Sequence, residues 1–524
     1  MNSLRKISVL LTLVLCVFTR VCQSVESSNQ NDSLTEKRKA ALNHYRLGRR
    51  NADLGQLYDL AIEEYKKAIQ LDPTIAEVYC ELGAAYRGKN MLDEAVKVYK
   101  HALTLESTDD TRGIANLCLG LIYMGQGKFE EAEKFASEAV KLIPNMAAAH
   151  YRLADIYVKR GKLKQAIAEY KRAIELDADL AEPYEGLGLI YTNQGKAEEA
   201  IKYYQEAIKR NRYNPDSYYN MARCYLRLKR MRKGKKLMDI FKRMKRYQEG
   251  VQRYKKASQK QPNDVTLRLK LAQLHYEHGN LDEVIREYEY VIYIAPDFAV
   301  AYNNIGLAYL EQGNFEKAKK AFEKTIELNP KAATAYFGLG QLYALQEKFN
   351  LSKSQYQKAI QLAPEYEPAY AGLVEIYLQQ HDPDSAIKIY AQFAKTQSES
   401  PQTWLRLGIL QIKGKRYDDA INSFERAIEL DSNCAEAYNN LAWLYVDRDE
   451  SLEEALELAK KAVELKPEAS HLDTLAYAYY KNGQYQEAEN EILRALELEP
   501  ENKAYLKRLE EIRRTIEAQQ DSAK

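Results

Sequence analysis

Apolar and small residues recur along most of the chain at helical spacing, in a block of 34 residues that repeats. The block from residue 299 has a small residue at position 8, Tyr at 11, Gly at 15, Ala at 20, an aromatic at 24 and Pro at 32, which are Gly306, Tyr309, Gly313, Ala318, Phe322 and Pro330. Positions 4, 7, 8 and 11 share one face of a first helix, and positions 20, 24 and 27 share one face of a second. The pattern therefore predicts tandem helix pairs.

The small residues of the block predict how the two helices of a pair pack. Gly or Ala at positions 8 and 20 lets the helices approach closely, and a large aromatic at position 24, such as Tyr99 or Phe322, fills the space beside them. Gly or a polar turn near position 15 ends the first helix, and Pro at position 32 ends the second. One pair cannot bury both of its faces, so we expect each pair to pack on the next.

About 13 blocks follow one another between roughly residues 41 and 500. Their approximate first residues are Ala41, Ala76, Gly113, Ala147, Ala181, Pro215, Val265, Ala299, Ala333, Glu367, Pro401, Ala435 and Ala469. As a set, these blocks resemble the tetratricopeptide repeat (TPR) family. The resemblance implies an all-α solenoid, a right-handed superhelix whose inner wall is lined by the first helices.

The N-terminus differs from the repeats in composition. Arg5 and Lys6 precede an apolar run at residues 7–18, which rises only about 18 Å as a helix, short of the roughly 30 Å hydrocarbon core of a membrane. This pattern predicts a signal peptide over residues 1–24, or a membrane anchor if it stays uncleaved, followed by a polar linker at 25–40. We therefore expect an exported protein of the periplasm or cell envelope, or of the secretory lumen in a eukaryote. Membrane contact is expected only through an uncleaved N-terminus.

The sixth block breaks the pattern in its second helix. The block begins at Pro215, but the next matching proline is Pro262, about 16 residues too late. The surplus, residues 227–246, has 11 Lys or Arg and one acidic residue, while its apolar residues keep helical spacing on one side. We expect two sub-arrays joined here: about six repeats over 41–226, a basic helical junction over 227–264, about seven repeats over 265–500, and a capping helix and tail over 501–524.

The basic junction has two interpretations. A run of charge is usually a solvated face, so the segment can be a solvated joint between the sub-arrays. It can also bind an anionic partner such as a lipid surface, an acidic polysaccharide or an acidic protein. We expect no nucleic acid, which an exported chain rarely meets. The candidate basic patch consists of Lys235, Lys236, Lys242, Arg243, Lys245 and Arg246.

The charge balance and the cysteines further limit the kinds of partner and site that we expect. Across the whole chain, 77 Lys and Arg nearly balance 75 Asp and Glu, so no global field favours a polyanion. Four cysteines remain beyond the signal peptide, without a C-x-x-C pair or a histidine at ligand spacing. We therefore expect buried, unpaired side chains at Cys80, Cys118, Cys224 and Cys434.

The sequence offers no catalytic constellation. Of seven histidines, His275 and His278 are the only close pair, and no acidic or thiol third ligand completes a metal motif beside them, so a packing role is favoured. There is no P-loop, G-x-S-x-G or H-E-x-x-H motif. We therefore expect no enzymatic activity, no catalytic residue, no cofactor and no metal site.

The resemblance also implies which residues face a groove. Inner-wall positions of the family carry Asn in a minority of the repeats here, as in the asparagine ladder of the O-linked N-acetylglucosamine transferase superhelix, and aromatic residues in others. An Asn amide donates and accepts, so such a row can pair with an extended peptide backbone, although Asn can equally be exposed or bonded to the neighbouring turn. The candidate groove residues are Tyr151, Tyr219, Asn220, Asn303, Asn304, Phe337, Asn439, Asn440, Trp443 and Tyr477.

Together these features favour an exported, non-catalytic TPR scaffold that binds protein or peptide partners in its concave groove and assembles a complex. One alternative is a component of an envelope polysaccharide-export machine, because long exported arrays of this family accompany such secretion. Another is a regulatory or targeting partner of a glycosyltransferase, because the partial Asn row resembles that superhelix while the transferase domain itself is absent.

Overall fold

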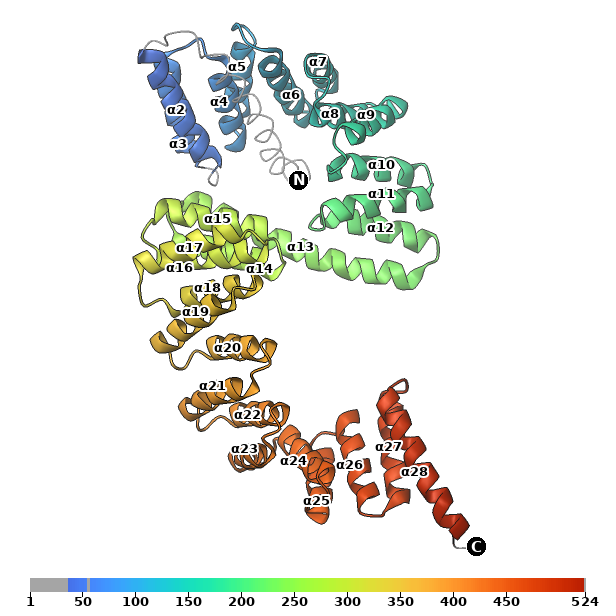
Figure 1. The fold of residues 1–524 in the computed structure, drawn as a ribbon. Helices are drawn as coiled ribbons and strands as arrows, with labels where there is room; N and C mark the ends of the chain where they lie inside the picture. Colours follow the sequence, from blue (N-terminus) through green and yellow to red (C-terminus); the bar gives the residue numbers. More distant parts are fainter. Residues whose placement is uncertain (1–35, 54–56, 523–524) are drawn as a thin grey trace. The chain divides into compact units, whose positions relative to one another are not determined.

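The computed structural model describes residues 36–53 and 57–522, and these residues form α-helices without a β-strand (Figure 1). The all-α TPR solenoid predicted from the sequence is confirmed. The proposed signal peptide at 1–24 and most of the linker at 25–40 lie outside the described residues, although the first helix already begins at Glu36. Among the described helices, none is both long and apolar enough to cross a membrane.

The chain forms two compact units that divide after Ala301. The helices of the N-terminal unit are α2 (Glu36–Asp53), α3 (Tyr58–Leu71), α4 (Ala76–Gly88), α5 (Leu92–Ala102), α6 (Asp109–Gly125), α7 (Phe129–Leu142), α8 (Ala147–Lys159), α9 (Leu163–Leu176), α10 (Ala181–Asn193), α11 (Ala197–Arg210), α12 (Pro215–Arg227), α13 (Met231–Lys260), α14 (Val265–Glu277) and α15 (Leu281–Ile294). From α2 to α15, each helix contacts the next one along the chain.

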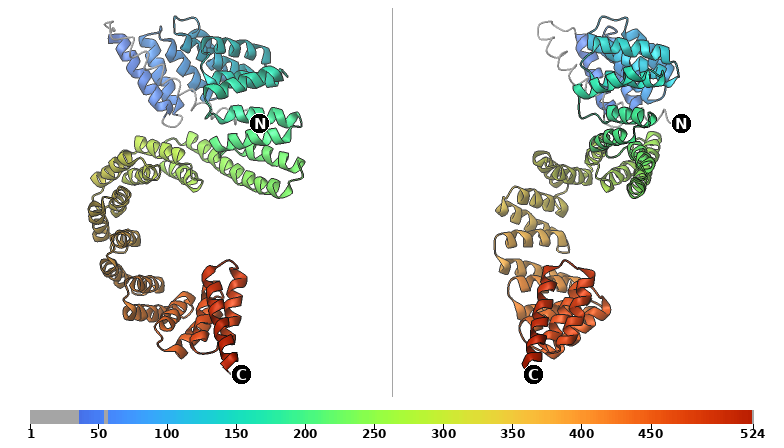
Figure 2. Two further views of the ribbon diagram at one scale, coloured as in Figure 1. Left: turned by 45° about the vertical axis from the view of Figure 1, so that its right-hand side comes forward. Right: turned by 90° about the vertical axis from the view of Figure 1, so that its right-hand side faces the viewer.

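The C-terminal unit begins within helix α16 (Ala299–Glu311). Its further helices are α17 (Phe315–Leu328), α18 (Ala333–Leu345), α19 (Phe349–Leu362), α20 (Glu367–Gln379), α21 (Pro383–Thr396), α22 (Pro401–Lys413), α23 (Tyr417–Leu430), α24 (Ala435–Asp447), α25 (Leu452–Leu465), α26 (Ala469–Lys481), α27 (Tyr485–Leu498) and α28 (Lys503–Ser522). Figure 2 shows that this unit follows a curved path from α17 to α28. The two compact units divide the chain differently from the predicted sub-arrays, which stay a prediction.

The 34-residue period sets the helix boundaries. Eleven of the thirteen predicted block starts coincide with the first residue of a helix, and the exceptions are Ala41 and Gly113. Helix α6 begins before Gly113, and the connection that precedes it, residues 103–108, is longer than the four-residue connection between α7 and α8. Helix α6 begins at Asp109 because the Thr108 hydroxyl accepts a hydrogen bond from the Thr111 N–H and two acidic residues occupy the first turn.

The first helix of each block ends near position 15, where the residue has a left-handed backbone conformation. Every described residue at this position from Asn90 onward has positive φ, between 53° at Asp449 and 79° at Gly195. Six of these residues are glycines, for which this conformation is free of steric cost, and the other six are larger residues. At Gly127, for example, the next N–H, of Lys128, donates to the Tyr123 carbonyl at 2.9 Å, which closes a Schellman-type cap.

The predicted packing of a small residue against a large one is confirmed. A Cβ atom built on Gly306 of α16 would lie 2.7 Å from the Phe322 ring of α17, and one on Gly83 of α4 would lie 2.7 Å from the Tyr99 ring of α5. Only glycine allows these helices their present distance. The four described cysteines are also buried and free, as expected.

The surplus of the sixth block lengthens a helix. Helix α13 has 30 residues, whereas α11, the second helix of the preceding pair, has 14. Residues Leu237, Met238 and Phe241 are half-buried and Met244 is buried, so the apolar side of α13 packs against its neighbours. The segment therefore continues the array as one long helix, with its basic side exposed.

Candidate functional site

Most of the candidate groove residues lie on the first helices of the C-terminal unit: α16, α18, α24 and α26. First helices contact the first helix of the next pair, as in α18 with α20, α22 with α24, and α24 with α26. In Figure 1, α20, α22 and α24 lie on the inner side of the bend, and α21, α23 and α25 lie on its outer side. The first helices of this bend therefore lie on its inner side, which we call the inner wall, and most of the candidate residues are on first helices.

The asparagines of this wall include two amide oxygens without a hydrogen-bond partner. On α16, the Asn303 Nδ2 donates to the Asn304 Oδ1 at 3.2 Å, while the Asn303 Oδ1 accepts no hydrogen bond. On α24, the Asn439 Oδ1 is also without a partner. Both atoms are shielded from solvent, and Asn303 is only 8% exposed. Since a buried polar atom without a partner costs free energy, these two oxygens are candidate acceptors for a hydrogen bond from a bound group.

The aromatic residues of the same wall are half-buried. Phe337 of α18 lies 5.7 Å from the Tyr356 ring and 5.4 Å, edge-on, from the Tyr366 ring, measured between ring centroids. Trp443 of α24 packs partly against the core. The guanidinium of Arg508, from α28, lies 4.1 Å from the centroid of the Tyr477 ring. These rings are held in place and offer only part of their surface, as is typical of stacking platforms.

The candidate groove residues of the N-terminal unit have different surroundings. Tyr151 of α8 is 1% exposed and its ring lies under the Arg152 guanidinium at 4.4 Å, so it belongs to the core; its prediction as a groove residue is corrected by its burial. Tyr219 of α12 is 37% exposed and its ring lies 5.1 Å from Phe241 of α13, and Asn220 is half-buried. The sequence signal at Tyr151 was misleading because inner-wall positions next to the helix pair are also core positions.

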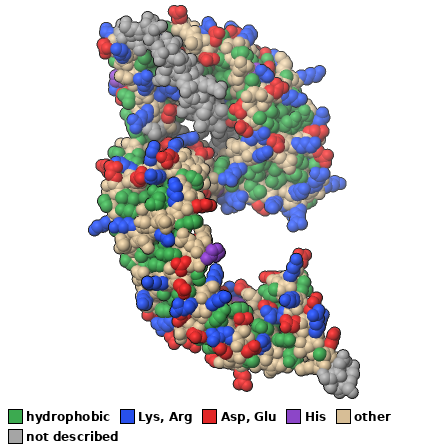
Figure 3. Space-filling model, in the orientation of Figure 1, with side chains coloured by type: hydrophobic (Ala, Val, Ile, Leu, Met, Phe, Trp, Pro, Cys, Tyr) green, Lys and Arg blue, Asp and Glu red, His purple; other side chains and the backbone are tan. Residues whose placement is uncertain are grey.

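The basic patch lies along one helix and is exposed. All six of its residues on α13 are exposed, and Figure 3 shows Lys and Arg side chains gathered along the edge of the N-terminal unit where α13 lies. Lys242 pairs with Asp239 at 3.7 Å and Lys245 with Glu249 at 4.0 Å, which are weak contacts between exposed groups. The other four, Lys235, Lys236, Arg243 and Arg246, have no ion pair with the described part of the chain.

One polar cluster was missed by sequence reasoning. His275 was interpreted as a packing residue without an acidic third ligand nearby, but Glu283 and Glu287 of α15 each place an oxygen within 4.8 Å of a His275 ring nitrogen. The carboxylates follow His275 by 8 and 12 residues, and only the turn between α14 and α15 brings them together. The available signal was His275 itself, at block position 11, where most other repeats have Tyr.

Family models match almost the whole described chain. Models described as "TPR repeat" and "Tetratricopeptide repeat" match residues 48–90, 76–109, 114–146, 154–195, 191–240, 243–304 and 299–332. A model described as "Cilia and flagella-associated protein 70 C-terminal domain" matches residues 332–524. The matches at 76–109, 114–146 and 299–332 each span one helix pair.

Individual relatives match over short stretches. The chain is 34% identical over 118 residues to "Protein STIP1 homolog" of Dictyostelium discoideum, covering 22% of this chain and 21% of that protein. It is 28% identical over 156 residues to "Protein O-mannosyl-transferase TMTC1" of Mus musculus, covering 29% and 16%. The chain thus spans about a fifth, or less, of the length of these relatives.

Solved structures resemble the chain only loosely. One is "Crystal structure of YrrB: a TPR protein with an unusual peptide-binding site", which is 22% identical, covers 37% of this chain and 97% of that one, and has a TM-score of 0.29. A likeness of that degree carries no inference about function.

Proposed function

We propose, from the premise that this chain belongs to the tetratricopeptide repeat family, that it is a non-catalytic scaffold that binds an extended protein segment along the inner wall of its C-terminal unit. The observation that carries the proposal is the set of amide and aromatic side chains on the first helices, in which Asn303 is buried, Asn439 is half-buried, and the Oδ1 atoms of both lack a donor.

A peptide backbone supplies what these oxygens lack. An extended segment presents N–H groups at regular intervals, and each hydrogen bond to a side-chain amide contributes about 0.5–1.5 kcal/mol net. Asn303 and Asn439 occupy the same block position four repeats apart, so one bound segment following the wall meets equivalent amides in turn. Side-chain amides bind the backbone of the partner and do not distinguish its side chains. We therefore expect the aromatic residues of the wall to determine which partner binds.

A photo-crosslinking amino acid placed at Trp443 tests this wall. In native extract, we expect it to capture a protein partner, because Trp443 lies among the amide-bearing residues of α24. The matched control is the same amino acid at Leu351 of α19, a second helix, where the native side chain is 48% exposed. Equal capture of the same protein at both positions would contradict a groove on the first helices.

The amides are tested by substitution. We expect Asn303→Ala with Asn439→Ala to weaken the captured partner's binding about tenfold, as the loss of two hydrogen bonds of about 0.7 kcal/mol each predicts. Asn433→Ala changes an exposed asparagine in the turn before α24 and serves as the control. If both variants bind as the unchanged protein does, the amide row has no part in recognition.

Export and the identity of the partner are further parts of the proposal. The apolar run at residues 7–18 supports a location in the periplasm, envelope or secretory lumen. Within such a compartment, capture of polysaccharide-secretion subunits would favour a role in an export machine. Capture of a glycosyltransferase would favour a regulatory or targeting role.

A second candidate function rests on the exposed cations of α13. Four of them lack an ion pair with the described residues, and a row of unpaired charge on one helix favours an anionic surface or polysaccharide. We expect the purified protein to be retained on phosphatidylserine vesicles and not on phosphatidylcholine vesicles.

A charge-matched pair of variants tests this surface. The test variant changes four residues of α13 to Gln: Lys235, Lys236, Lys242 and Arg243. The control changes four exposed lysines of α3 and α5 to Gln: Lys66, Lys67, Lys97 and Lys100. Retention should fall only in the first variant. Equal retention of the two variants would mean that α13 does not bind the anionic surface and is a solvated joint.

A further inference from the structure

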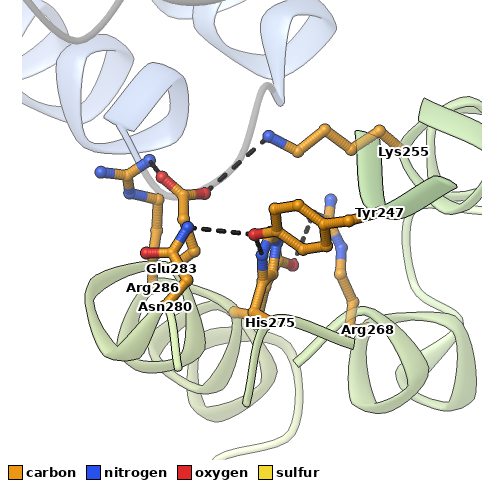
Figure 4. Close-up of polar contacts among 8 residues, drawn as sticks. Tyr247, Lys255, Arg268, His275, Asn280, Glu283 and Arg286 are labelled. Atoms are coloured by element: carbon orange, nitrogen blue, oxygen red, sulfur yellow. Dashed lines mark hydrogen bonds and ion pairs between the residues drawn. The ribbon is translucent and has the colours of Figure 1, made fainter. Parts of the chain in front are cut away.

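The repeat formed by α14 and α15 has an ionisable interior. Arg268, His275 and Glu287 are 6%, 2% and 4% exposed, respectively. Figure 4 shows Arg268 and His275 turned toward Tyr247 of α13, with Lys255 of α13 and Glu283 of α15 beside them. Burial of so many ionisable groups in one repeat demands partners for each of them.

The His275 ring has one partner and one vacant nitrogen. Its Nδ1 lies 2.7 Å from the Tyr247 hydroxyl, and that hydroxyl accepts a hydrogen bond from the Asn280 Nδ2 at 3.0 Å. The His275 Nε2 is buried and has no hydrogen-bond partner. When Nδ1 carries the proton and donates it to Tyr247, Nε2 presents a lone pair to the interior.

An arginine side chain contacts each of the two carboxylates beside this nitrogen. The Arg286 Nη1 lies 2.5 Å from the Glu283 Oε1, and the Arg268 Nη1 lies 3.0 Å from the Glu287 Oε2. The Glu283 Oε2 is buried and accepts no hydrogen bond, and the Lys255 ammonium lies 3.9 Å from it. Each carboxylate is thus oriented by a guanidinium, and the Glu283 Oε2 is left without a hydrogen bond.

We propose that His275, Glu283 and Glu287 bind a divalent transition-metal ion of the Zn²⁺ type. Their ligand atoms lie within 4.8 Å of one another, so small rotations of the side chains bring all three to bonding distance of one ion. One imidazole nitrogen with two carboxylate oxygens is a donor set that suits Zn²⁺ and its neighbours, with a position left for water. Tyr247, Arg286 and Arg268 form the outer shell that orients the ligands.

The positively charged residues around the site determine how the ion binds and how tightly it is held. Lys255 has a flexible stem and a contact too long for a hydrogen bond, so the ion displaces its ammonium from the Glu283 Oε2 into solvent. The two arginines remain and neutralise the carboxylates in part, which favours a modest affinity over a tight one.

Metal titration of the full chain tests the site. The protein is stripped with a chelator, and Co²⁺ is added as a spectroscopic probe. We expect one equivalent to bind with visible d–d absorption, and Zn²⁺ to displace it while Mg²⁺ does not. The absence of stoichiometric Co²⁺ and Zn²⁺ binding would overturn the proposal.

Variants identify the ligands. His275→Tyr installs the residue that α10 has at the same block position, Tyr191, so the helix pair should fold while the Co²⁺ spectrum disappears. The control His278→Gln removes the neighbouring histidine, whose Nδ1 bonds the Leu274 carbonyl at 2.9 Å, and should leave the spectrum unchanged.

Two further variants separate a ligand from an orienting group. Glu283→Gln removes a ligand charge at constant size and should abolish binding. Tyr247→Phe removes only the hydroxyl that fixes His275, and should weaken Co²⁺ binding by about 10- to 100-fold. Unchanged binding by either His275→Tyr or Glu283→Gln would overturn the assignment.

Discussion

Helix pairs α10–α11 and α14–α15 follow the same repeat pattern but differ at three of its positions, which are aromatic in the first pair and ionisable in the second. In α10–α11, block positions 4, 11 and 23 are tyrosines, and two of them, Tyr191 and Tyr203, stack with ring centroids 5.3 Å apart. In α14–α15, the same positions are Arg268, His275 and Glu287. The helix lengths are identical in the two pairs, 13 and 14 residues.

This difference teaches that the backbone of the repeat is set by its small and left-handed positions rather than by its interior aromatics. Gly195 and Gly279 end the first helix of each pair with positive φ, and both pairs keep Leu at position 7. Ionisable side chains can therefore be buried inside a repeat where each of them has a polar or charged partner. A buried ion pair contributes little net stability, so its presence here is better explained by a role such as metal binding.

The largest expected effect comes from breaking the buried ion pair. Arg268→Met leaves the Glu287 carboxylate buried without its guanidinium, and we expect the opening free energy of α14–α15 to fall by about 3–5 kcal/mol. Burial already raises the pKa of Glu287, so protonation relieves part of the loss at low pH. Hydrogen exchange of the α14 and α15 amides measures the opening free energy of this region.

The double variant Arg268→Met with Glu287→Leu is the control for this prediction. It replaces both charges with apolar groups of similar volume, so most of the lost stability should return. A double variant as unstable as the single one would mean that the ion pair itself, and not the unpaired charge, stabilises the repeat.

A smaller effect is expected at the close contact of the aromatic pair. A Cβ on Gly188 would lie 2.7 Å from the Tyr204 ring, which is 1% exposed, so Gly188→Leu should overpack α10 against α11 and cost about 1–3 kcal/mol. Urea unfolding followed by circular dichroism measures the loss. Gly125 of α6 has open space around its Cβ position, so Gly125→Ala should be neutral or slightly stabilising.

The architecture could be predicted because its determinants are local. A first helix that ends at position 15 needs a residue that tolerates positive φ, and the period of small and aromatic residues places each helix on the next. Asn90 and His381 show that this turn persists even without glycine. The helical conformation of the basic segment within α13 also followed from the spacing of its apolar residues.

The candidate sites could be predicted only in part, because their properties depend on packing between helices. Burial of Tyr151 and the vacant oxygens of Asn303 and Asn439 arise from neighbouring helices, which the sequence pattern does not specify. The cluster around His275 joins side chains of α13, α14 and α15. Its sequence signal is confined to Arg268 and His275, at block positions 4 and 11, where most other repeats have Tyr.

The smallest expected effect is a pH dependence that the ionisable pair has and the aromatic pair lacks. Burial lowers the pKa of His275 to about 4 from an ordinary value of 6.5, an effect opposed by Glu283 and reinforced by the positive charges of Lys255 and Arg286. Above pH 6.5 both folded and unfolded forms are neutral, so His275 contributes nothing. As the pH falls from 6.5 toward 4, only the unfolded chain binds the proton, and the folded state loses stability.

Comparison with His275→Tyr isolates this contribution, because the other titrating groups of the chain, including Glu287 with its raised pKa, are common to both proteins. In the presence of a chelator, the opening free energy of α14–α15 should fall by about 1–2 kcal/mol more in the unchanged protein than in the variant between pH 7 and pH 5. Parallel pH profiles would mean that the imidazole is as easily protonated in the folded chain as in the unfolded one, and that the interior of this repeat is open to water.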